Sequence, residues 1–366
     1  MYSFPMWTNT VAVLMMLAFA ASAQQRPKLA INSESEQGKL LQEIEQQNDE
    51  AKKQALLEQF AAKYPKHQGA PWVYEQLQTL YLKHNEFDKT LDSGSKALAI
   101  DGADLDAAYH NLKAAEGKKD PDLVKKWALE TSQIARKTAG SDPKHAEYTR
   151  QVDVYCEYSL YSTALRSADP AKTIDLVESL EQLNPKSQYL PKVYGNYLNA
   201  LRQSGQADKA GAGAEKLADR DAATPDVLLI AADYNLQKKN QPDKVILYST
   251  KLLNALQSDA DAELKKNSLA GLANWMLGIT YAAQVKYGQA DKSLRAALPN
   301  LNDEQVRASA LFYLGVADYQ LGKSTQHKDL ILDALQFSQQ SAAISSPQQA
   351  QAQKNVRAIQ GELGMR

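Results

Sequence analysis

Cysteine is almost absent from this chain, since Cys156 is the single cysteine among 366 residues. One thiol cannot form an intramolecular disulfide, so the fold has to be held together by packing. Cys156 stands among tyrosines in a run that is typical of a helix, and the neighbouring sequence offers no base that could activate its sulfur. We therefore expect a small buried apolar side chain at this position.

An excess of charge of one sign is also missing. The chain has 42 Lys and Arg residues against 43 Asp and Glu residues, a net charge of -1. Binding to nucleic acid or to an anionic bilayer depends on clustered cations, and nothing in the overall charge indicates them. We therefore expect no nucleic-acid partner.

The sequence contains few runs of alternating Val, Ile and Thr, which are typical of strands. Helix-forming residues dominate instead, as in the stretch from Glu43 to Lys63. This balance predicts an all-α protein.

Motifs that carry chemistry are absent too. There is no His-Glu-x-x-His, no Gly-x-Ser-x-Gly, no phosphate-binding loop and no paired-cysteine metal motif. The histidines are scattered without ligand-like spacing, and we expect them at surfaces or helix ends: His67, His84, His110, His145 and His327. The composition and motifs therefore predict no metal, no cofactor and no enzymatic activity.

Two short patterns resemble binding sites and are better explained otherwise. Gly211 and Gly213 lack the preceding strand and the third glycine of a dinucleotide site, so we expect them only to weaken a helix, by about 1 kcal/mol each relative to alanine. Asp101, Asp104 and Asp106 lack the central glycine of a calcium loop, and we expect these carboxylates to cap helices.

The amino terminus has the pattern of a secretory signal. Val11 to Ala20 form an apolar block, and small residues end at Ala23 before Gln24. We expect residues 1–23 to be a signal peptide and 24–33 a flexible segment, which places the protein in the periplasm or outside the cell. The block is about half the ~20 residues that span a bilayer, so we expect no stable membrane span after cleavage. No Lys or Arg precedes Val11, and a retained short anchor is the alternative.

Proline and glycine punctuate the rest of the chain at intervals of roughly forty residues, with one gap of about twice that length. Because these residues end helices, the breaks predict about eight helical hairpins over residues 34–347. Residues 348–366 form one more helix with Val356, Ile359 and Leu363 on one side, which we expect to cap the array. The turn over 117–121 is expected to be longer than usual, and an insertion around 324–327 to account for the extra length of the last unit.

The clearest unit runs from Asn274 to Leu298. Its first helix contains Leu277, Gly278 and Tyr281, and after a turn over 285–288 its second helix has Ala290, Leu294 and Ala297. Small residues at Gly278 and Ala290 let the two backbones approach closely, and the larger side chains supply the apolar surface that this approach buries. Similar patterns recur over residues 313–322 and, as Gly-x-x-Asp-Lys-Ala, over 205–210.

This order of residue types resembles the tetratricopeptide repeat. The resemblance implies an α-solenoid of stacked helix-turn-helix hairpins that forms a right-handed superhelix. It covers residues 34–347, with units nearer forty residues than the 34 of that family. HEAT-like repeats share the longer unit, but the Leu-Gly-x-x-Tyr and Gly-x-x-Asp-Lys-Ala patterns favour the tetratricopeptide repeat.

The resemblance also implies where partners would bind, because in this family the first helix of each hairpin lines a concave face that takes segments of other proteins. Residues that the motif leaves off the packing seam are the candidates for that face. They are Trp72, Tyr155, Tyr158, Leu272, Trp275, Ile279, Phe312, Val316 and Tyr319. The alternative is that these side chains pack between neighbouring units.

Some members of the family clamp a terminal carboxylate with Lys, Arg and Asn on their leading helices. Asn199 and Arg202 lie in a suitable helix, but Gly195 stands where the clamp has Lys. Lys192 and Asn196 have the right spacing, and we expect them to face the packing side. The clamp is therefore not the favoured hypothesis.

Together these observations predict a non-catalytic, exported scaffold that binds other proteins or peptides. The alternative function is a periplasmic chaperone or assembly factor that handles envelope proteins. A single stoichiometric partner would favour the scaffold, and suppression of client aggregation would favour the chaperone.

Overall fold

The computed structural model describes Asn32 and residues 34–139, 146–220, 223–239, 241–258 and 263–365. Throughout these ranges the regular structure is helical and no strand occurs, so the predicted all-α class is confirmed. The predicted signal peptide and, apart from Asn32, the segment over 24–33 lie outside the described residues. Among the helices that are described, none is both long enough and apolar enough to cross a membrane.

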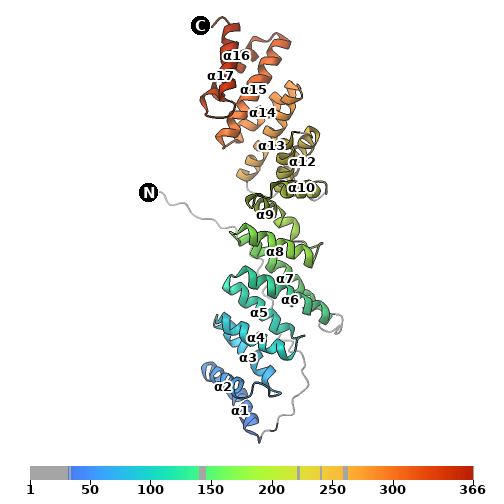
Figure 1. Ribbon diagram of the computed structural model, residues 1–366, viewed down its shortest axis with the longest axis vertical. Helices are drawn as coiled ribbons and strands as arrows, with labels where there is room; N and C mark the ends of the chain where they lie inside the picture. The colour runs from blue at the N-terminus through green and yellow to red at the C-terminus, as the bar shows by residue number, and fades with distance from the viewer. Residues whose placement is uncertain are drawn as a thin grey trace, which may run out of the picture. The chain divides into compact units, whose positions relative to one another are not determined.

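Figure 1 shows the helices in chain order. They are α1 (Glu36–Gln46), α2 (Glu50–Lys63), α3 (Ala70–Lys83), α4 (Phe87–Ile100), α5 (Leu105–Lys118), α6 (Pro121–Ala139), α7 (Ala146–Arg166), α8 (Pro170–Leu183), α9 (Leu190–Gln203), α10 (Ala207–Ala218), α11 (Pro225–Lys238), α12 (Pro242–Ser258), α13 (Glu263–Ala283), α14 (Tyr287–Ala297), the short 3₁₀ helix η2 (Leu298–Asn300), α15 (Glu304–Thr325), α16 (Lys328–Ala343) and α17 (Gln349–Glu362).

Proline and capping residues set the boundaries of these helices. Pro170 and Pro225 occupy the first turns of α8 and α11, where a missing N–H leaves no bond unmade. At the amino end of α2, the Asp49 carboxylate accepts a hydrogen bond from the backbone N–H of Lys52 at 3.1 Å. In the same way Asp104 accepts from the N–H of Ala107 at 3.0 Å, so its predicted capping role is confirmed.

The chain divides into two compact units, one up to His110 and the other from Asn111 onward, with the division inside α5. In the first unit, α1, α2 and α3 bury a cluster made of Leu41, Ile44, Leu57, Phe60, Val73, Leu77 and Tyr81. A second cluster joins α3 to α4 and to the start of α5 through Ala70, Tyr74, Ala97 and Ala107. Each helix therefore packs on its neighbours along the chain.

The second unit continues the same pattern, because each helix from α6 to α17 contacts the next one in the sequence. Within the described residues, direct packing joins the pairs α1–α2, α3–α4, α7–α8, α9–α10, α11–α12, α13–α14 and α15–α16, and α17 packs on α16. The core of the last hairpins is made of Ala282, Ala290, Leu294, Ala297, Leu301, Ala310, Leu314 and Ala317. Alanines at these contacts let α14 lie between α13 and α15 at short range.

Two connections were predicted to contain extra residues. Helix α5 runs on to Lys118, and only Lys119 and Asp120 separate it from α6, because Lys119 adopts the left-handed conformation (φ 55°). The Asp120 carboxylate then accepts from the N–H of Leu123 at 3.1 Å and caps α6. The long turn predicted over 117–121 is therefore wrong. Near residues 324–327, where an insertion was predicted, helix α15 continues to Thr325.

Helix α17 covers one side of the last hairpin. Ile359 packs on Ala334 and Leu335 of α16. The Glu362 carboxylate accepts a hydrogen bond from the Tyr319 hydroxyl at 2.6 Å and also pairs with Lys323. A capping helix would make contacts of this kind, and the capping role of residues 348–366 remains a prediction.

Glycine is required where two helices touch. A Cβ atom on Gly278 would lie 2.4 Å from Cγ of Leu294, and one on Gly211 would lie 2.1 Å from Cδ2 of Tyr234. Gly211 was expected only to weaken α10. The structure corrects this, because the ring of Tyr234 on α11 occupies the space that any larger residue would need.

We predict that Gly211→Ala lowers the free energy of unfolding by about 2 kcal/mol or more, because the new methyl group overlaps the Tyr234 ring. The matched control is Gly361→Ala in α17, where an added Cβ meets nothing within 4 Å. That variant should be neutral or stabilising by up to about 1 kcal/mol. Thermal and urea unfolding of both variants measure the difference, and a stabilised Gly211→Ala protein would contradict the packing described.

Candidate functional site

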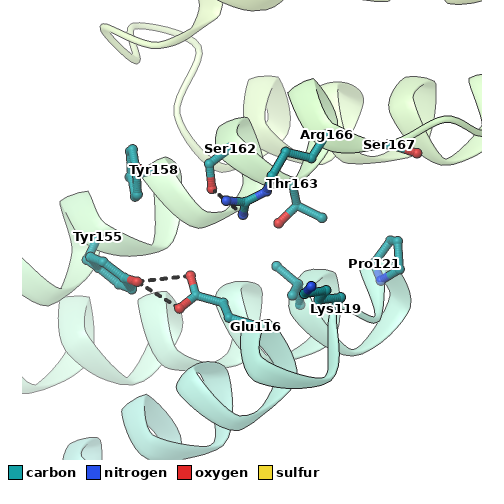
Figure 2. A pocket seen from close by; sticks show the side chains of 10 residues that line it. Glu116, Lys119, Pro121, Tyr155, Tyr158, Ser162, Thr163, Arg166 and Ser167 are labelled. Atoms are coloured by element: carbon teal, nitrogen blue, oxygen red, sulfur yellow. Dashed lines mark hydrogen bonds between the residues drawn. The ribbon is translucent and has the colours of Figure 1, made fainter. Parts of the chain in front are cut away.

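A pocket of about 640 Å³ opens between the carboxyl-terminal end of α5, the start of α6 and helix α7 (Figure 2). It is lined by Glu116, Lys119, Pro121, Val124, Tyr155, Tyr158, Ser162, Thr163, Arg166 and Ser167. The lining therefore combines aromatic rings, hydroxyl groups and charges of both signs. All of these residues belong to the second unit.

Helix α7 supplies most of the lining because its two sides differ in character. Val152, Cys156 and Leu160 are fully or almost fully buried and pack into the core, at spacings of four residues. The predicted role of Cys156 as a buried apolar group is confirmed, and burial raises the pKa of its thiol. The other side of α7 carries tyrosines three residues apart, which neighbour one another on the helix surface.

The tyrosines of α7 and Tyr189 form a continuous set of aromatic rings, which we call the tyrosine platform: Tyr155, Tyr158, Tyr161 and Tyr189. Along α7, successive ring centroids are 5.9 Å and 6.2 Å apart. Tyr189, at the amino end of α9, stacks on Tyr161 at 5.1 Å and meets Tyr158 edge-on at 5.8 Å. Tyr158 joins the platform to the pocket, and 42% of its surface is exposed.

One wall of the pocket is fixed by Glu116 of α5. Its carboxylate accepts hydrogen bonds from the Tyr155 hydroxyl at 2.7 Å and from the Ser159 hydroxyl at 2.6 Å (Figure 2 shows the Tyr155 contact). The Lys113 ammonium lies 3.5 Å from the same carboxylate and 3.9 Å from the centroid of the Tyr155 ring. Tyr155 is therefore held in one orientation, and the charge of Glu116 is largely satisfied within the protein.

The positively charged side chains at this site differ from Glu116 in their contacts. Arg166 donates a hydrogen bond to the Ser162 hydroxyl at 3.2 Å, and Lys192 lies over the Tyr189 ring at 5.7 Å. Within the residues that the structure describes, neither of these nor Lys119 forms an ion pair with a carboxylate. The pocket and the tyrosine platform therefore present an excess of positive charge to solvent.

The structure brings together only part of the predicted concave face. Tyr155 and Tyr158 both line the pocket. Trp72 lies in the first unit, half-buried against the cluster around Phe60. Its role in binding a partner remains a prediction.

The remaining candidates lie on α13 and α15, and none of them lines the pocket. Leu272, Trp275 and Ile279 are half-buried against the core of the last hairpins, and the Trp275 indole N–H donates to the Ser309 hydroxyl at 3.2 Å. On α15 the partly buried candidates are Phe312, Val316 and Tyr319. The Phe312 ring packs edge-on against Tyr313, and Tyr319 is hydrogen-bonded to α17. These side chains contribute to packing, whatever further role they have.

Sequence reasoning missed Glu116, Lys119, Arg166, Tyr161 and Tyr189 as site residues. The three-residue spacing of the tyrosines on α7 could have indicated Tyr161. Glu116 lies 39 residues before Tyr155, so only the packing of α5 on α7 reveals their contact. Tyr189 stands at the start of another helix and likewise needs the tertiary structure.

The clamp residues lie differently from their prediction. Lys192 and Asn196 are exposed on α9, so the expectation that they face the packing side is wrong. Their helix presents this side to solvent because Val193, Tyr194 and Leu198 fill the core. Arg202 is paired with Asp233 at 3.1 Å.

A second group of charged residues surrounds Arg295 on α14. Its guanidinium contacts Asp291 at 2.5 Å, Asp318 at 2.6 Å and Asp333 at 3.1 Å. The Asp318 side chain is completely buried, and one guanidinium cannot balance three carboxylates. Burial, together with a hydrogen bond to Asp291, raises the pKa of Asp318 to about 8, although Arg295 opposes the shift.

This group does not form a metal site. Among the described residues, no three His, Cys, Asp or Glu side chains are arranged to hold a metal ion. His110 lies within α5 and is half-buried, and burial lowers its pKa. His145 lies outside the described residues.

No family model matches the chain, and no curated protein matches it. Similar solved structures include the APC/C hetero-tetramer Cut9-Hcn1 (13% identity, covering 90% of this chain and 57% of that chain, TM-score 0.37) and the TPR domain of P58(IPK) (12% identity, 90% and 99% covered, TM-score 0.32). A third is Naa15/Naa10 bound to HypK-THB (13% identity, 90% and 61% covered, TM-score 0.21).

This chain therefore spans 57% of the length of the Cut9-Hcn1 chain that it matches. The packing of this chain's own helices establishes its fold. The close contacts of Gly278 with Leu294 and of Gly315 with Ser338 lie where the repeat motif places its small residues. The fold is TPR-like in that sense, and the right-handed superhelix remains a prediction.

We predict that Asp318→Asn flattens the pH dependence of stability. A folded-state pKa raised above the unfolded value gives stability that is present at low pH and is lost as pH rises from about 4 to about 8. Between pH 5 and 8 the variant should gain at least about 1 kcal/mol relative to the wild type. Asp329→Asn, an exposed carboxylate on α16, is the control and should show no such trend. Urea unfolding across this pH range measures both, and parallel curves for Asp318→Asn and wild type would contradict the assignment.

Proposed function

We propose that this protein is a non-catalytic, exported scaffold that binds segments of other proteins. The observation that carries the proposal is the tyrosine platform together with its pocket. Aromatic side chains with exposed edges, next to Arg, are the residue types that dominate protein-binding hot spots. Tyr158 is a large aromatic residue that remains exposed although it contacts three other rings.

The chemistry of the pocket supports binding in preference to catalysis. The Ser159 hydroxyl and the Glu116 carboxylate are 2.6 Å apart, but the same carboxylate also accepts from Tyr155. A general base needs a free lone pair and an orienting partner, and this carboxylate is already engaged by two hydroxyl groups and a nearby ammonium. The wall that Glu116 forms is suited to positioning Tyr155.

The preformed geometry also favours a defined partner over many unfolded clients. Tyr155 is fixed by hydrogen bonds, and Tyr161 stacks on Tyr189 with an interplanar angle of 23°. Rings that are already ordered lose little conformational entropy when they bind, which favours a specific contact. A chaperone that handles many envelope proteins is the alternative.

A photo-reactive phenylalanine analogue in place of Tyr158 tests this function in intact cells. We expect it to crosslink one predominant protein in the cell envelope fraction, whereas the same analogue in place of Gln182, exposed on α8, should not. Adding Arg166→Ala to the Tyr158 variant should weaken the crosslink several-fold. Mass spectrometry of this protein, recovered together with its crosslinked partner, should show a mature chain that begins at Gln24.

The outcomes separate the hypotheses. Many crosslinked chains of similar abundance would favour the chaperone. No crosslink at Tyr158, in a protein with an unaltered circular dichroism spectrum, would contradict the scaffold. An unprocessed chain recovered from the cytosol would contradict export.

A further inference from the structure

The tyrosine platform has hydrogen-bond donors that the protein does not use. Among the described residues, the hydroxyls of Tyr158 and Tyr161 have no protein acceptor. Burial raises the pKa of Tyr161, so its hydroxyl keeps its proton and remains a donor. Tyrosine hydroxyls beside apolar surface usually find a partner when they are covered. An occupant of the platform should therefore offer both apolar surface and free acceptors.

The arrangement of the rings limits the shape of that occupant. Neighbouring rings are tilted by 46° for Tyr155 and Tyr158 and by 51° for Tyr158 and Tyr161. Rings tilted in this way do not form one flat plate. An occupant that contacts several of them therefore has to present separate, compact apolar groups in place of one flat face.

The charge around the platform limits the occupant further. Arg166 and Lys119 stand at the pocket end, and Lys192 stands at the end formed by Tyr189. None of the three is neutralised by a carboxylate of the described residues. Acidic side chains at either end of a bound segment would complement these cations.

The geometry points to a proline-rich, extended segment flanked by acidic residues as the occupant of the tyrosine platform. This inference rests on the proposed function and names its class of partner. A polyproline II segment has no internal hydrogen bonds, so its carbonyl groups are free to accept from Tyr158 and Tyr161. Its pyrrolidine rings are compact apolar groups of the kind that pack on aromatic side chains, and its stiffness reduces the entropy lost on binding.

An amphipathic helix from the partner fits these observations less well. The carbonyl groups of a helix are already bonded within the helix, so they would leave the two tyrosine hydroxyls covered and unbonded. A strand would need an open sheet edge, and the described residues contain no sheet. The extended segment is therefore the occupant that uses every unsatisfied group of the platform.

Synthetic peptides test the inference on the full mature chain by isothermal titration calorimetry at low salt. The first peptide has about eight prolines between pairs of aspartates. The second replaces the aspartates by lysines, and the third replaces the prolines by alternating glycine and serine. We expect the first peptide to bind, the second to bind at least about tenfold more weakly, and the third to show no detectable binding.

Conservative variants assign the binding to the platform. Tyr158→Phe keeps the ring and removes the hydroxyl, and it should weaken the first peptide about two- to tenfold. Tyr197→Phe is the matched control, because this tyrosine on α9 donates to Glu178 and stands outside the platform. Arg166→Ala should reduce the preference for aspartates over lysines, whereas Arg202→Ala, which removes a cation paired with Asp233, should not.

Each outcome bears on the inference. Equal binding of the proline and glycine-serine peptides, or tighter binding of an amphipathic helical peptide, would overturn it. If no proline peptide binds while Tyr158 still crosslinks a partner in cells, the occupant assigned here is wrong and the scaffold function stands. If the crosslink also fails, both proposals fail together.

Discussion

The close approach of neighbouring helices at small residues is the contact on which the rest of this structure depends. At Gly211 and Gly278 the neighbouring side chain occupies the space of a Cβ atom, and at Gly315 the Ser338 hydroxyl would lie 2.7 Å from one. Alanines at 290, 297, 310 and 317 extend the same seam through the last hairpins. Because the helix backbones lie so close together, Leu294 and Leu314 are completely buried. Their dispersion and hydrophobic contacts stabilise a fold that has no disulfide.

The same packing leaves one side of α7 available. Cys156, Leu160 and Val152 satisfy the core on one side of the helix, so the opposite tyrosines are not needed for it. They contact one another and Tyr189, while Glu116 and Lys113 of α5 fix the position of Tyr155. The chemistry of this site comes from rings, hydroxyls and cations that no carboxylate of the described residues neutralises. Helices hold these groups in an arrangement suited to recognition.

The sequence predicts the helical class and the positions of most helix ends, because proline, glycine and capping residues act locally. Asn184 ends α8 and Pro225 begins α11, as their residue types indicate. The exceptions have local causes too. Lys119 adopts the left-handed conformation, which shortens a turn that the residue types over 117–121 had predicted to be long. Gly211 is different, because its importance depends on Tyr234 of the next hairpin.

The site was harder to predict for the same reason. Tyr155 and Tyr158 stand out in sequence as aromatic residues on a first helix. Glu116 and Tyr189 become part of the site only when α5 and α9 pack beside α7. Trp275 looked equally exposed in sequence, yet its ring is half-buried against α15 and its N–H is bonded to Ser309. Periodicity in the sequence identifies which residues share one side of a helix, but the neighbouring helices determine what that side contacts.

A double-mutant cycle on Gly278 and Leu294 tests the helix seam most directly. Gly278→Ala and Leu294→Ala should each destabilise the protein, by about 2 kcal/mol or more, because one adds a clash and the other leaves a cavity. In the double variant the added methyl group occupies part of the space that Leu294 vacates, so its loss of stability should be smaller than the two single losses combined by at least about 1 kcal/mol. Strictly additive losses would show that the two helices do not meet at this point.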